Sequence, residues 1–109
     1  MISVTILKNR NNEYVGFNCL GHAEYARAGR DIICAGVSAL VINTINSIEQ
    51  LTSCSIVYDE NQKDGMLNVS LPDGSSKEAD LLIDSMILGL KGIIKGQGKA
   101  YVTLKIREV

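Results

Sequence analysis

The chain has 109 residues, 46% of them hydrophobic, which is enough for one core, and we expect a single domain over residues 1–109. Eleven Lys and Arg against twelve Asp and Glu give a formal net charge of −1 without a basic run, which argues against a nucleic-acid partner. Three cysteines, no signal-peptide pattern and only short apolar stretches argue against secretion and a membrane span, so a cytoplasmic location is expected.

A β-hairpin is predicted at the start of the chain. Residues 2–8 are rich in β-branched residues and alternate apolar with polar positions, and residues 13–20 resume this pattern after a turn rich in Asn. Gly21 lets the backbone bend sharply at the end of the second strand, which places His22 at the strand's exit. The small and charged residues 23–30 are then expected to form a surface loop that can move.

A long amphipathic helix is predicted from Asp31 to Leu51. As the N-cap residue, Asp31 would accept a hydrogen bond from a backbone N–H of the first turn, which stabilises a helix by about 1 kcal/mol. This start would make Cys34 the third residue of the first turn. The residues expected to face the core recur at the i, i+4, i+7 spacing: Ile33, Val37, Leu40, Val41, Thr44, Ile45, Ile48 and Leu51.

The second half of the chain predicts another hairpin, a second helix and a last strand. Strands are expected at residues 54–59 and 66–71, and Ser75 or Ser76 is expected to cap the helix that follows. Residues 99–107 alternate again as a final strand. The order is therefore ββαββαβ, an α+β domain with a mostly antiparallel sheet and two packed helices.

The residues from Gly21 to Ser38 contain the groups needed for nucleophilic catalysis. A helix N-terminus or an adjacent imidazolium lowers the pKa of a thiol, and the backbone N–H groups of a first turn can hold an oxyanion, so Cys34 could attack a peptide carbonyl with His22 as base and then acid. Asp31 could orient His22 or only cap the helix. Ser38 lies one turn beyond Cys34, where its hydroxyl could bond to the site or to the Cys34 carbonyl.

Simpler interpretations of the same residues stay open. A lone Cys in an apolar helix is usually a core residue, and a lone His is usually a surface or hydrogen-bonded residue. Cys19 and Cys54 lie in strand patterns without a neighbouring His and are interpreted as structural. No Cys-x-x-Cys pair, phosphate loop or dinucleotide motif is present, so no metal and no cofactor is expected.

Three blocks of the sequence, GHA at residues 21–23, DIICAGVS at 31–38 and LLIDSMILGLK at 81–91, resemble the ribosomal-processing cysteine protease family, Prp. The resemblance covers essentially the whole chain. It implies His22 and Cys34 as the catalytic pair, with Gly21, Asp31 and Ser38 as supporting residues, and the chain departs from the family pattern at none of these five positions.

The resemblance also implies a substrate. Members of the family remove the N-terminal extension of a large-subunit ribosomal protein, cutting after a pair of aromatic residues and before Ala, and they are homodimers. Residues 23–30 would then be a wall of the peptide groove, and an apolar pocket would hold a Phe side chain. Two alternatives stay open: a non-catalytic ribosome-associated or RNA-binding module of the same fold, and a thiol oxidoreductase, which would need a second cysteine near Cys34.

Overall fold

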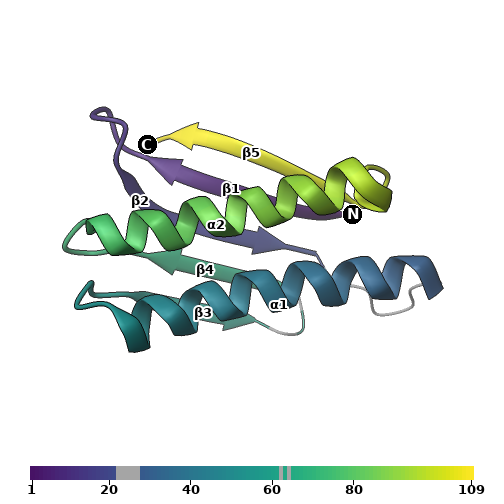
Figure 1. Cartoon of the computed structure of the whole chain (residues 1–109), viewed down its shortest axis with the longest axis horizontal. Helices are drawn as coiled ribbons and strands as arrows, with labels where there is room; N and C mark the ends of the chain where they lie inside the picture. The colour runs from purple at the N-terminus through teal and green to yellow at the C-terminus, as the bar shows by residue number, and fades with distance from the viewer. Residues whose placement is uncertain (22–27, 62, 64) are drawn as a thin grey trace.

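The structure, a computed structural model, describes residues 1–21, 28–61, 63 and 65–109, with the backbone alone for residues 28–31. The described residues form five strands and two long helices in the predicted order ββαββαβ (Figure 1). The elements are β1 (Ile2–Lys8), β2 (Tyr14–Leu20), α1 (Ala28–Leu51), β3 (Val57–Asn61), β4 (Met66–Ser70), α2 (Lys77–Ile93) with a π-helical extension η1 (Ile94–Gly98), and β5 (Val102–Glu108).

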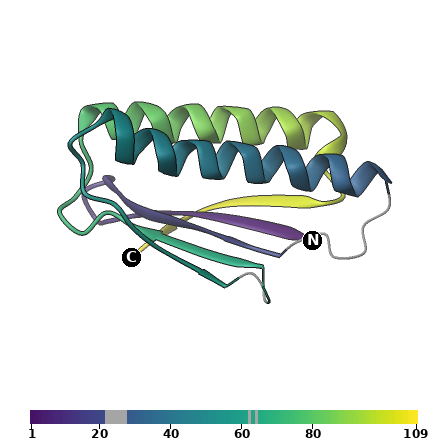
Figure 2. The ribbon, with the colours of Figure 1, turned by 90° about the horizontal axis from the view of Figure 1, so that it is seen from below.

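The strands form one sheet in the order β3-β4-β2-β1-β5. Every neighbouring pair is antiparallel except β1 and β5, which are parallel. Both helices cover the same face of this sheet, as Figure 2 shows. The expected α+β class, with a mostly antiparallel sheet and two packed helices, is confirmed.

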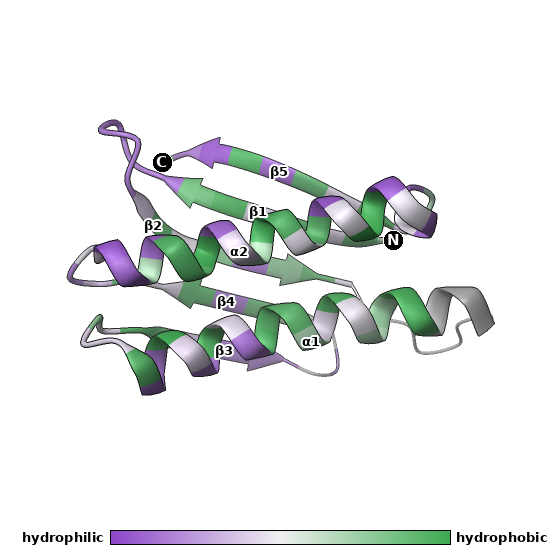
Figure 3. Cartoon of the chain, viewed as in Figure 1, coloured by the Kyte–Doolittle hydropathy of each residue, from purple (hydrophilic) through white to green (hydrophobic). Residues whose placement is uncertain are grey.

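The core lies between the sheet and the two helices. Alternate residues of β1, namely Ile2, Val4 and Ile6, are buried, as period-2 alternation requires of a strand with one covered face. Helix α1 buries a stripe at the predicted spacing. Figure 3 shows hydrophobic and hydrophilic segments alternating along both helices. The buried residues of this stripe are Ile33, Val37, Val41, Thr44, Ile45 and Ile48.

Helix α1 is also long and apolar enough, over Ile32–Leu51, to cross a membrane by length and composition alone. The sequence argument from short apolar stretches did not anticipate this. Core helices of globular proteins meet the same criterion, and here the apolar stripe packs against the sheet and α2.

The start of α1 differs from the prediction. The helix begins at Ala28, so Asp31 is its fourth residue and cannot be the N-cap, and the predicted cap is wrong. Ala and Arg favour helix, and a Gly near a helix end costs little, so residues 28–30 extend the helix although they lack a capping signal. By contrast, the predicted cap of α2 is confirmed, because the Ser76 hydroxyl accepts a hydrogen bond from the Ala79 N–H at 3.1 Å.

Strand β3 also lies further along the chain than predicted. Cys54 belongs to the turn after α1, where its N–H donates to the Thr52 hydroxyl at 3.1 Å, and the strand starts at Val57. Glu60, which the sequence pattern assigned to a turn, is therefore a strand residue. This shift matters for the site, because it gives the Glu60 side chain a defined face of the sheet.

Candidate active site

The end of β2 holds the chain in a conformation that only glycine adopts easily. Gly21 has φ 103°, and its N–H donates to the Gly65 carbonyl at 2.9 Å. A Cβ at this position would lie 2.4 Å from the Met1 carbonyl oxygen. The backbone is thus fixed immediately before His22, which itself lies outside the described residues, as does most of the predicted loop over residues 23–30.

Cys34 lies on the face of α1 that packs against the sheet. Its thiol is free, and 8% of the residue is exposed. Because α1 begins at Ala28, Cys34 is its seventh residue, beyond the four N–H groups that a helix start leaves unpaired. The predicted placement of the sulfur in the first turn is therefore wrong. The side chain of Asp31 lies outside the described residues.

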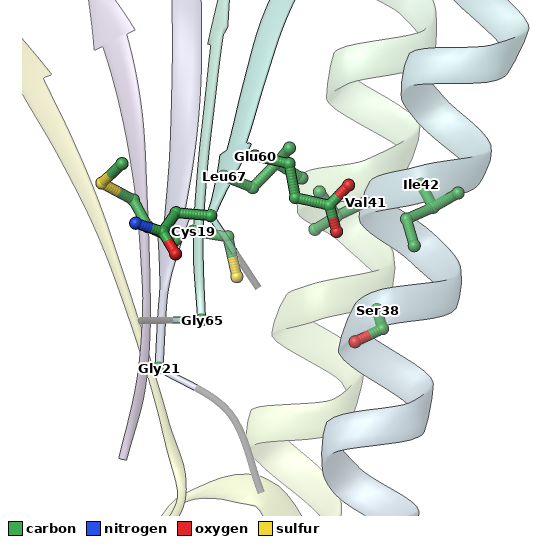
Figure 4. Close-up of a pocket in the computed structure, with 10 residues that line it drawn as sticks. Cys19, Gly21, Ser38, Val41, Ile42, Glu60, Gly65 and Leu67 are labelled. Atoms are coloured by element: carbon green, nitrogen blue, oxygen red, sulfur yellow. The ribbon is translucent and has the colours of Figure 1, made fainter. Parts of the chain in front are cut away.

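Ser38, one turn beyond Cys34, is exposed. Within the described residues, its hydroxyl makes no hydrogen bond to the Cys34 carbonyl. Instead, the side chain points toward the sheet and lines a cavity, as Figure 4 shows. Ser38 is thus available to contact a bound molecule.

This cavity, of about 190 Å³, lies between α1 and the neighbouring ends of β2, β3 and β4. Its wall includes Gly21, which directly precedes His22, and Ser38, which follows Cys34 by one helical turn. The end of β2 and helix α1, which follow one another in the chain, therefore both line this cavity. The described lining residues are Cys19, Gly21, Ser38, Val41, Ile42, Glu60, Asn61, Gly65, Met66 and Leu67.

A second cavity of about 160 Å³ adjoins the first along α1. Ile42, Glu60 and Leu67 line both cavities. The second cavity is completed by Ile45, Asn46 and Tyr58. Together the two cavities form a groove between α1 and strands β3 and β4, which we call the α1–β3 groove.

Cys19 is a lining residue that the sequence analysis interpreted as structural. Burial raises the pKa of its thiol, and negative charge on Cys34 raises it further. The two thiols are thus close enough to interact electrostatically, although all three cysteines of the chain are free. The alternation of β2 contained a signal for this position, because it places Cys19 on the same face as the buried Phe17.

The chain matches the family model described as cysteine protease Prp over residues 1–103. It is 32% identical to the ribosomal processing cysteine protease Prp of Bacillus subtilis, in an alignment that covers 85% of this chain and 87% of that protein. It is 35% identical to the protein of the same name from Staphylococcus aureus, over 85% of this chain and 88% of the relative.

Solved structures of similar proteins share the fold of this chain. A crystal structure of Prp from Staphylococcus aureus in complex with a substrate peptide matches with a TM-score of 0.89 and 27% identity, covering 98% of this chain and 100% of that one. A Streptococcus mutans protein matches with a TM-score of 0.88 and 26% identity, over 100% of this chain and 96% of that one. With a family match over nearly its whole length and relatives above 30% identity, the chain belongs to the Prp family of cysteine proteases.

Proposed function

We propose that this cysteine protease removes the N-terminal extension of a large-subunit ribosomal protein, cutting after aromatic residues and before Ala, with Cys34 and His22 as its catalytic dyad. The observation that carries the proposal is the cavity bounded by Gly21 and Ser38, since it adjoins the position of His22 in the chain and lies one turn from Cys34. The Staphylococcus aureus relative has been crystallised with a substrate peptide and with a covalently linked product peptide, which supports a peptide substrate and a covalent step.

In this mechanism, the Cys34 thiolate adds to the carbonyl carbon of the scissile bond and forms a tetrahedral intermediate. The C–N bond breaks as His22 gives a proton to the departing amine, which becomes the N-terminus of the shortened protein. His22 then deprotonates a water molecule, which adds to the thioester; the C–S bond breaks, the extension leaves, and the Cys34 thiolate is restored. No cofactor and no metal takes part.

The cavity fits the proposed specificity in size and character. Val41, Ile42, Met66 and Leu67 give it an apolar wall. Its volume of about 190 Å³ is below the roughly 300–1,000 Å³ of pockets that enclose drug-sized ligands. An aromatic side chain of an extended peptide is an occupant of suitable size and polarity.

The test is incubation of the purified protein with a peptide that carries a Phe-Phe-Ala junction, read by mass spectrometry. We expect the wild type to cut before Ala, and Cys34→Ala and His22→Ala to retain the fold without cutting. Cys54→Ala is the matched control and should cut normally, because Cys54 lies in the turn after α1 and its thiol donates to the Gly74 carbonyl at 3.3 Å. Normal turnover by Cys34→Ala would refute the dyad.

The same variants separate the two other candidates. A non-catalytic ribosome-associated or RNA-binding module would bind a partner but cut no peptide. A thiol oxidoreductase is favoured by one observation, the effect of the charge on Cys34 on the pKa of the Cys19 thiol. Its activity would need both thiols, whereas a protease needs only Cys34, so Cys19→Ser should retain peptide cleavage.

A further inference from the structure

Glu60 occupies a special position in the α1–β3 groove. It pairs with Leu67 of β4, which pairs in turn with Cys19 of β2, so these three residues form a row across the face of the sheet that α1 covers. Figure 4 shows the Glu60 carboxylate directed toward α1, near Val41 and Ile42. Glu60 also lines both cavities, so it stands at their junction.

The Glu60 side chain is exposed, and its carboxylate faces the α1–β3 groove. Among the described residues that line the two cavities, Glu60 is the one with a charge, and its carboxylate makes no hydrogen bond or ion pair with a described residue. A carboxylate beside apolar walls can form a charge-assisted hydrogen bond with an incoming cation. The described residues of the groove therefore combine two apolar subsites with one negative charge between them.

We propose that Glu60 is a specificity residue that binds a cationic group of the peptide substrate, while apolar side chains occupy the cavities on either side. This inference rests on the proposed function and assigns a substrate feature to the same groove. A Lys or Arg side chain of the extension and the free α-amino group at its N-terminus share the required chemistry. Acetylation of the peptide's N-terminus distinguishes the two sources.

The next residue along the strand supplies a matched control. Side chains alternate along a strand, so Asp59 points to the opposite face of the sheet, where it lines a separate depression with Asn18 and Asn68. Glu60→Gln and Asp59→Asn remove the same charge from adjacent positions of β3. Both residues are exposed, so both variants should fold.

The experiment measures kcat/KM on N-acetylated peptides with one cleavage junction, in which a single Lys or a single Gln is moved along the residues before the junction. At one position of the peptide, the wild type should have a kcat/KM about two- to fivefold higher with Lys than with Gln, as expected of a partly exposed ion pair. Glu60→Gln should lose this preference, whereas Asp59→Asn should keep it. Added salt should weaken it in the wild type.

A preference for Lys that survives in Glu60→Gln would overturn the assignment of Glu60 as the cation-binding residue. Equal kcat/KM for the Lys and Gln peptides at every position would overturn it as well. A preference that appears only with a free N-terminus would assign the cation to the α-amino group. Affinity of the same peptides for Cys34→Ala keeps the two proposals distinguishable. Charge-dependent binding without cleavage by the wild type would refute the protease function but retain the Glu60 site. Cleavage without charge dependence would support the protease function and refute the Glu60 site.

Discussion

Cys19 and Cys34 occupy opposite walls of the space between β2 and α1, and the charge on Cys34 affects the ionisation of the Cys19 thiol. Burial raises the pKa of Cys19, and the charge on Cys34 raises it further, so Cys19 holds little thiolate at neutral pH. The thiolate is the form that alkylating reagents attack. The reactivity of individual thiols therefore reports the local electrostatics of the site.

We expect iodoacetamide at neutral pH to label Cys34 much faster than Cys19 or Cys54, as a catalytic thiolate requires, with mass spectrometry to locate the label. In Cys34→Ser, which removes the ionisable thiol with little change in volume, the pH midpoint for labelling of Cys19 should fall. Cys54→Ser should leave that midpoint unchanged. Three equally sluggish thiols in the wild type would contradict a resting Cys34 thiolate.

Among the secondary-structure elements, β2 and α2 are joined by a partly buried polar contact. The Tyr14 hydroxyl donates a hydrogen bond to the Asp84 carboxylate, and the Lys8 ammonium lies 4.8 Å from the centre of the Tyr14 ring. The pKa of Tyr14 is raised, chiefly by burial, then by the hydrogen bond to Asp84 and by the charges of Asp84 and Asp80. The contact thus holds only while the phenol is protonated.

Tyr14→Phe should lower the free energy of unfolding by about 1–2 kcal/mol at neutral pH, because it removes a hydrogen bond to a charged acceptor. The pKa of Tyr14 is higher in the folded protein than in the unfolded chain, where it is 10.0. The protonated phenol therefore stabilises the fold fully below pH 10, and this stabilisation is lost as the pH rises through the folded-state pKa. The deficit of Tyr14→Phe should therefore shrink above pH 10. Urea unfolding from pH 7 to 11 measures the difference in free energy of unfolding between the wild type and Tyr14→Phe, and Tyr58→Phe, at an exposed position, is the control. A difference that is constant with pH would contradict the prediction.

The sequence predicted the elements well where periodicity was strong and poorly where boundaries depend on tertiary contacts. Alternation located β1 and β2, and the Ser76 cap located α2. Asp31 resembles a cap, yet α1 extends three residues further because helix-forming residues precede it. Glu60 resembles a turn residue, yet pairing with β4 keeps it in a strand. Local preference is a weak guide wherever a neighbouring strand supplies the hydrogen bonds.

The candidate site shows the same limit. Gly21 and Ser38 could be named from motifs, and the fold places both on one cavity wall. Cys19 and Glu60 could not be named, because they reach the cavity through strand pairing across β2, β4 and β3, and no motif links them to the Cys34 block. Residues that meet only across a sheet are recognisable once the strand order is known.

At the scale of the whole molecule, both helices cover one face of the sheet (Figures 1 and 2), and the α1–β3 groove lies beside β3, an edge strand of that sheet. We expect a homodimer, as the family resemblance implies, with a mass about twice the 11.8 kDa of the chain in sedimentation experiments. A peptide must still reach Cys34 and Glu60 in each copy, so the dimer should form through surfaces outside the α1–β3 groove. Glu60→Gln and Cys34→Ala should then sediment like the wild type. A single 11.8 kDa species at all concentrations would refute the dimer, and dissociation caused by Glu60→Gln would show that the interface occupies the groove.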